Sequence, residues 1–168
     1  VPWYSHSSSI KTVNIGDGVT SIGDWAFYYC TNLTSVKIGN SVTTIGDRAF
    51  SNCTSLTSIT IPDSVTTIGD YAFYFCDSLT SVTIPDSVVT IGYSAFTRCE
   101  DLVSVAIPGS VTAIGKGVFE RCDNLTSITV DADNQYYSSD SCGVLYNKNK
   151  TELIQYPIGN ERTTFTIP

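Results

Sequence analysis

Histidine and cysteine, the residues that most often carry catalysis or bind transition metals, give this chain little chemistry. The single histidine, His6, lies in the first ten residues, so the rest of the chain lacks the commonest general base. Five of the six cysteines recur every 23 residues, at Cys30, Cys53, Cys76, Cys99 and Cys122. Equivalent positions point the same way, which predicts a buried ladder of free thiols and no CxxC zinc site. Cys142 breaks the period and is the cysteine expected to be accessible.

Two polar groupings could in principle do chemistry. Asp131, Asp133 and Asn134 are spaced like calcium ligands, but the segment lacks the glycine and the distant glutamate of an EF-hand, so a polar connector is expected. One serine recurs in each repeat, at Ser35, Ser58, Ser81, Ser104 and Ser127. No histidine or pair of lysines lies near these serines to activate them. We therefore predict no catalytic residue, no metal site and no cofactor, and a protein that is not an enzyme.

The remaining candidates are aromatic and arginine side chains that vary between repeats. They are Trp25, Tyr28, Tyr29, Arg48, Tyr71, Tyr74, Phe75 and Tyr93. A helical projection places these positions outward or on the flank, where Arg48 can stack on Trp25 or Tyr71. Exposed aromatic and arginine residues are typical of binding hot spots. In the alternative interpretation, the rings lie flat over the edge of the core and only shield it.

A 23-residue repeat must position these side chains. One unit reads LTSITIPDSVTTIGDYAFYFC, from Leu56 to Cys76. Its β-branched first part predicts a short strand, and the Pro-Asp-Ser that follows predicts a turn. Asp70 is placed to cap a short helical turn, on which Ala72, Phe73 and Cys76 share one face.

A single unit cannot fold alone. About eight buried apolar side chains at ~1.5–3 kcal/mol each face a backbone entropy cost of ~1–2 kcal/mol per residue. Stacking of neighbouring units is therefore required. We predict an α/β repeat solenoid, a right-handed leucine-rich repeat coil with a parallel sheet on the concave face and short helical turns opposite. The phenylalanines should form one continuous column.

The ends of the array depart from the repeat, and we expect one domain over residues 1–168. Residues 1–9 form an N-terminal cover, in which Trp3 and Tyr4 shield the end of the core. The repeats occupy residues 10–130. Residues 131–161 form an insert with a β-hairpin, because runs at 143–147 and 152–156 alternate in hydrophobicity around a polar link. Residues 162–168 begin a further repeat.

The charge of the chain limits its partners. A net charge of -7 and a pI near 4.4 argue against nucleic acid and against anionic membranes. The longest apolar runs are far shorter than the ~20 residues that span a bilayer, and no signal segment is apparent. We therefore expect no membrane insertion of this segment.

The segment IPDSVTTIGDYAFYFCDSLTSVTIP resembles the BspA-like class of leucine-rich repeats, with its I-G-x-x-A-F-x-x-C-x-x-L signature. The resemblance covers residues 10–130, and residues 134–168 resemble a hairpin insert found between such repeats. It implies an extracellular or cell-surface bacterial protein, often associated with adhesion. The expected function is non-catalytic binding of a host or bacterial surface protein or glycan. The alternative is a structural spacer or self-association scaffold without its own ligand.

Overall fold

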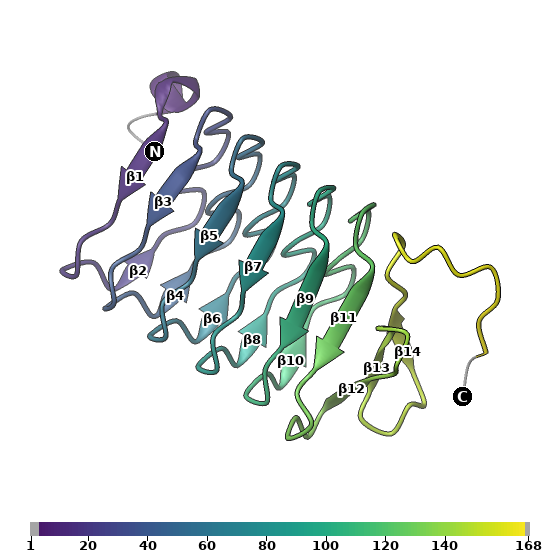
Figure 1. Cartoon of the computed structure of the whole chain (residues 1–168). Helices are drawn as coiled ribbons and strands as arrows, with labels where there is room; N and C mark the ends of the chain where they lie inside the picture. Colours follow the sequence, from purple (N-terminus) through teal and green to yellow (C-terminus); the bar gives the residue numbers. More distant parts are fainter. Residues whose placement is uncertain (1–3, 167–168) are drawn as a thin grey trace.

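The computed structural model describes residues 4–166 and forms a coil of parallel strands (Figure 1). Each 23-residue unit, here called a coil, contributes one longer and one shorter strand. The longer strands are β1 (Thr12–Asn14), β3 (Ser35–Lys37), β5 (Ser58–Thr60), β7 (Ser81–Thr83), β9 (Ser104–Ile107) and β11 (Ser127–Val130). The shorter strands are β2 (Ser21–Ile22), β4 (Thr44–Ile45), β6 (Thr67–Ile68), β8 (Thr90–Ile91) and β10 (Ala113–Ile114). The predicted solenoid with parallel strands is confirmed.

The pairing register reproduces the sequence period. In the longer strands Ile59 pairs with Val82, and in the shorter strands Ile45 pairs with Ile68. The shorter strands form a continuous five-stranded parallel sheet. The sequence predicted a single parallel sheet, so this second sheet was not expected. Because the register equals the period, every residue lies beside its equivalent in the next coil.

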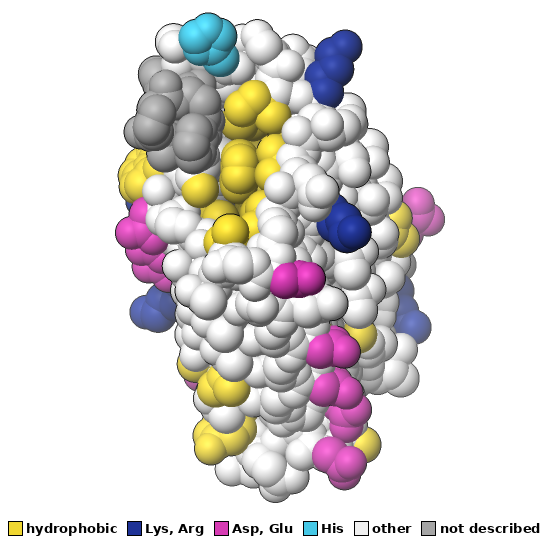
Figure 2. Space-filling view, turned by 90° about the vertical axis from the view of Figure 1, so that its left-hand side faces the viewer, with side chains coloured by type: hydrophobic (Ala, Val, Ile, Leu, Met, Phe, Trp, Pro, Cys, Tyr) yellow, Lys and Arg dark blue, Asp and Glu magenta, His cyan; other side chains and the backbone are white. Residues whose placement is uncertain are grey.

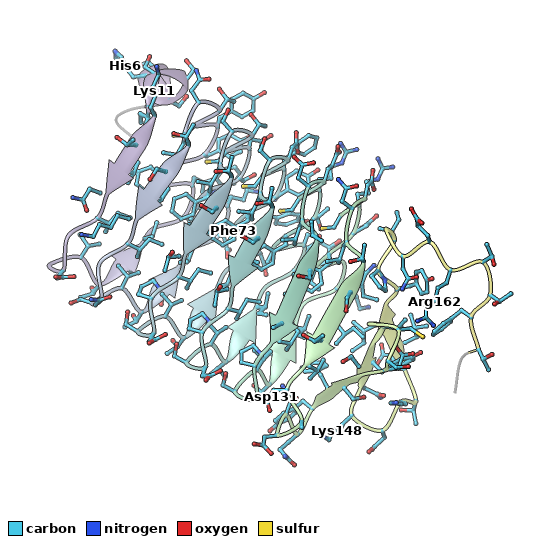
Figure 3. All side chains as sticks on the ribbon, in the orientation of Figure 1. His6, Lys11, Phe73, Asp131, Lys148 and Arg162 are labelled. Carbon is cyan, nitrogen blue, oxygen red and sulfur yellow. The ribbon has the colours of Figure 1, made fainter. Side chains whose placement is uncertain are left out.

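Phenylalanine and cysteine fill the core as two columns. Adjacent phenylalanine rings from Phe27 to Phe119 stack with centroids 5.2 to 5.8 Å apart, and Phe73 lies inside the coil (Figure 3). The Cys76 thiol donates to the carbonyl oxygen of Phe50 at 3.2 Å, and three other coils repeat this bond. These cysteines are free and buried, as predicted, and burial raises the pKa of the Cys76 thiol.

The predicted short helical turns are wrong. Between residues 10 and 166 the structure contains no helix, and the segment after each shorter strand alternates two kinds of backbone hydrogen bond. Tyr74 N–H bonds locally to the oxygen of Tyr71, whereas Phe73 N–H bonds across to Ala95 in the next coil. The Asp70 carboxylate accepts the backbone N–H of Tyr93 in the next coil, so it does not cap a helix. Bonding between coils has replaced bonding within a helix.

The C-terminal insert forms a three-stranded antiparallel sheet. It contains β12 (Tyr137–Ser139), β13 (Leu145–Asn147) and β14 (Leu153–Gln155), with β13 in the centre. The sequence predicted β13 and β14 but missed β12. In the connector that leads into this sheet, the amide of the fully buried Asn134 donates to the carbonyls of Pro108 and Val111 and accepts two backbone N–H groups. Asn134 thus links the insert to the last coils, in agreement with the polar connector predicted from the sequence.

The N-terminal end presents a hydrophobic area (Figure 2). A hollow of about 440 Å³ lies there, lined by first-coil residues that include Val13, Ile15 and Val19. The 3-10 helix η1 (Tyr4–Ser9) precedes this coil. Trp3, predicted to cover this end, lies outside the described residues. No helix within residues 4–166 is long and apolar enough to cross a membrane.

Candidate functional site

The segments between the shorter strands and the next longer strands carry all eight candidate residues. Equivalent residues lie side by side, so Trp25, Arg48 and Tyr71 form one column. Tyr29, Asn52, Phe75 and Arg98 form another. We define the aromatic–arginine surface as the eight sequence candidates plus one further residue: Trp25, Tyr28, Tyr29, Arg48, Tyr71, Tyr74, Phe75, Tyr93 and Arg98.

Much of this surface stands on left-handed backbone. The φ angles are 59° at Trp25, 63° at Tyr29, 53° at Arg48, 56° at Tyr71 and 61° at Phe75. For an L-residue, left-handed backbone costs about 1–2 kcal/mol because the Cβ crowds the following carbonyl. The position equivalent to Trp25 in the fifth coil is a glycine, Gly117, with φ of 67°. Large side chains therefore occupy positions where glycine would cost less.

Arg48 lies between two rings. Its guanidinium carbon is 4.6 Å from the Trp25 ring centroid and 4.2 Å from that of Tyr71. The sequence predicted stacking on one ring or the other, and the structure shows both contacts. The ring of Tyr93, at the position equivalent to Asp70, lies 5.2 Å from the Tyr71 ring at 63°. The pKa of the Tyr71 hydroxyl is raised by desolvation and then by the neighbouring Tyr93, while the Arg48 charge opposes the shift.

The remaining rings join the columns edge to face. Tyr28 packs against Trp25 with centroids 4.9 Å apart, and Tyr74 packs against both Tyr71 and Phe75 at 5.6 and 5.3 Å. Each contact of this kind is worth about 0.5–1.5 kcal/mol. The rings therefore hold one another in place.

The surface is anchored and still accessible. Trp25, Tyr29 and Tyr93 are 42%, 49% and 45% exposed. The other six members of the surface are partly exposed: Tyr28, Arg48, Tyr71, Tyr74, Phe75 and Arg98. The two interpretations of the sequence, binding and shielding, thus both describe part of the arrangement.

Arg98 was missed from the sequence. Its guanidinium carbon lies 4.5 Å from the ring centroid of Phe75, in the coil before it. The signal was present, because Arg98 follows Phe75 by 23 residues. The same spacing led to the prediction that Arg48 stacks on Trp25 or Tyr71, but it was not applied to Phe75.

The surface offers flat rings, hydroxyls and guanidinium groups. Among residues 4–166 no cluster of three or more His, Cys, Asp or Glu side chains is arranged to hold a metal ion. A hollow on the strand side, lined by Lys37, Thr60 and Asp63 among others, contains none of the surface residues. The aromatic–arginine surface lies outside this hollow, and its exposed rings and guanidinium groups can act by contact.

Comparison with known proteins gives a family and several solved structures. The model of the BspA type leucine rich repeat region matches residues 3–126 and 43–157, in six copies. No curated protein sequence matches the chain.

Three solved bacterial proteins are similar to this chain. A leucine-rich repeat protein from Eubacterium ventriosum is 37% identical with a TM-score of 0.88, covering 100% of this chain and 44% of its own. The pneumococcal vaccine antigen PcpA is 28% identical with a TM-score of 0.87, covering 94% and 39%. A leucine rich cell surface protein from Faecalibacterium prausnitzii is 35% identical with a TM-score of 0.67, covering 95% and 49%. The chain spans less than half the length of each.

Proposed function

This chain belongs to the BspA type leucine rich repeat family, and on that premise we propose that it is a non-catalytic binding segment of a bacterial cell-surface protein. The aromatic–arginine surface makes the contact, and the partner is a host or bacterial surface protein or glycan. A surface location is supported by the Faecalibacterium prausnitzii relative, which is described as a cell surface protein. A role in adhesion follows from such a contact.

The observation that carries this proposal is the presence of large, accessible side chains on left-handed backbone. Ser94 and Gly117, at the position of Trp25 and Tyr71, have the same left-handed backbone without an aromatic ring. So does Asn52, at the position of Tyr29 and Phe75. Closing the coil therefore does not require Trp25 or Tyr71. Strained backbone that bears accessible aromatic residues is a feature of functional surfaces.

The chemistry of the surface favours binding over catalysis. Ring faces, tyrosine hydroxyls and guanidinium groups supply apolar area and hydrogen bonds. None of them is a general base at neutral pH, and the surface holds no serine or cysteine beside a base. This agrees with the non-catalytic character that is typical of leucine-rich repeats.

The test compares two sets of substitutions on arrays of glycans and extracellular-matrix proteins. The first variant combines Trp25→Ser, Tyr71→Ser and Tyr74→Ser. The matched control combines Val89→Ser and Val103→Ser, which removes exposed apolar side chains outside the surface. We expect the triple variant to lose binding by more than about tenfold, the loss that removing a hot spot produces.

Thermal unfolding of both variants separates loss of binding from loss of fold. Retained binding by the triple variant together with a lowered melting temperature would show that the rings only stabilise the coil. The segment would then be a spacer, and the proposal would be wrong.

A further inference from the structure

The Arg48 guanidinium is fixed in place by the protein without being neutralised by it. Rings on both sides, Trp25 and Tyr71, limit its movement. Within residues 4–166 it makes no hydrogen bond and no ion pair. Its five N–H donors are therefore available to a ligand.

The acidic neighbours of Arg48 along the chain and in the next coil are occupied with the backbone. The Asp47 carboxylate accepts the N–H of Asp70, and the Asp70 carboxylate accepts the N–H of Tyr93, at 2.8 and 2.7 Å. Each carboxylate thus ties its own coil to the next. Within residues 4–166 neither carboxylate forms an ion pair with the Arg48 guanidinium.

We propose, building on the function above, that Arg48 anchors a carboxylate-bearing sugar on the aromatic–arginine surface. A stacked guanidinium presents two parallel N–H groups in the fork that matches a carboxylate. The exposed Trp25 ring then packs against the apolar face of the sugar. Neighbouring tyrosine hydroxyls, such as that of Tyr28, serve as hydrogen-bond donors and acceptors for sugar hydroxyls.

Two features favour a sugar over an acidic peptide. The backbone of this side is already used, because alternate N–H groups such as those of Trp25, Phe27 and Tyr29 donate to the next coil. An extended peptide therefore cannot add main-chain hydrogen bonds here. The surface is also open, which suits a ring laid flat against other rings.

The charge of the chain selects for a ligand with a single anionic group. The net charge is -7, and Asp24, Asp47 and Asp70 adjoin the arginine column. These charges repel every anionic group of a ligand, so the repulsion grows with the number of such groups. A sugar with one carboxylate held at Arg48 is repelled less than a polyanion.

The test uses the fluorescence of Trp25, which lies against Arg48. The chain contains two tryptophans, so all measurements are made in a Trp3→Phe background. Sialyllactose is titrated against lactose, and glucuronic acid against glucose. We expect saturable fluorescence changes with at least one acidic sugar and binding of its neutral counterpart that is at least about tenfold weaker.

Substitution of Arg48 tests whether this residue is responsible for binding the acidic sugar. Arg48→Lys keeps the positive charge and the backbone strain but loses the planar fork, and we expect at least about tenfold weaker binding of the acidic sugar. Arg121→Lys is the matched control, because Arg121 also has positive φ and is exposed, but lies outside the aromatic–arginine surface. It should bind the sugar as the parent does.

Three results would overturn the inference: no binding of either acidic sugar, equal binding of acidic and neutral sugars, or tighter binding of a glutamate-rich peptide. These failures are distinguishable from failure of the proposed function. If the Trp25, Tyr71 and Tyr74 triple variant still loses array binding, the surface binds a partner of another chemistry. If it does not, the surface has no binding role.

Discussion

Replacing Arg121 with glycine should stabilise the protein. Arg121 has φ of 55°, is exposed, and its side chain makes no hydrogen bond, ion pair or ring contact within residues 4–166. Relief of the left-handed strain contributes about 1–2 kcal/mol, and the greater flexibility of unfolded glycine offsets about 0.5–1 kcal/mol of it. The midpoints of these two ranges give a net gain in the free energy of unfolding of about 0.75 kcal/mol.

The assay is thermal unfolding followed by circular dichroism. For a chain of this length, 1 kcal/mol corresponds to about 2–4 °C in melting temperature, so the expected rise is about 1–4 °C. Arg121→Ala is the control, since alanine removes the same charge but retains the Cβ that causes the strain. An equal rise in both variants would refute the reasoning, because the charge and not the backbone would then be responsible.

Replacing Tyr71 with glycine should lower the stability of the protein, unlike the same replacement at Arg121. Tyr71→Gly relieves a similar strain but loses the contacts with Arg48, Tyr74 and Tyr93. At about 0.5–1.5 kcal/mol each, these contacts outweigh the relief, and the melting temperature should fall. A rise equal to that of Arg121→Gly would show that the ring contacts add nothing to stability.

Two further predictions concern titrating groups. The Oδ1 atom of Asp77 is buried and, among the described residues, has no hydrogen-bond partner. Burial raises the pKa of this carboxyl most, and the charge of Glu100 raises it further. The ionised form of Asp77 therefore destabilises the fold at neutral pH. Asp77→Asn should raise the melting temperature at pH 7, and this advantage should shrink as the pH falls through the raised pKa; a constant advantage would contradict it. Native Cys76 and Cys99, with buried thiols of raised pKa, should resist iodoacetamide while the partly exposed Cys142 reacts, and mass spectrometry that finds equal labelling would contradict this.

The core was predictable because the period alone determines it. Leu56, Phe73 and Cys76 recur at one spacing, and stacking equal coils places each beside its equivalents. All three are fully buried, as expected from the pattern. No knowledge of the backbone path within a coil was needed for this result, because a fixed register follows from any regular stacking.

The backbone of the turn side was not predictable in the same way. The spacing of Ala72, Phe73 and Cys76 is compatible with a helix, and local sequence signals favoured one. A helix satisfies its N–H groups internally, whereas here Tyr71 and Phe73 donate to Tyr93 and Ala95 in the next coil. The competing partner is 22 residues away, so no local window of sequence contains it.

By itself the sequence determined that the chain is a stacked repeat, which residues fill its core, and that aromatic and arginine residues vary together on one side. Only the tertiary structure decided that Arg48 lies between two rings, that Arg98 covers Phe75, and that Asn134 joins the insert to the last coils. The physical reason is that these contacts depend on backbone direction at each position. That direction is set by hydrogen bonds between coils, which form only when the coils stack.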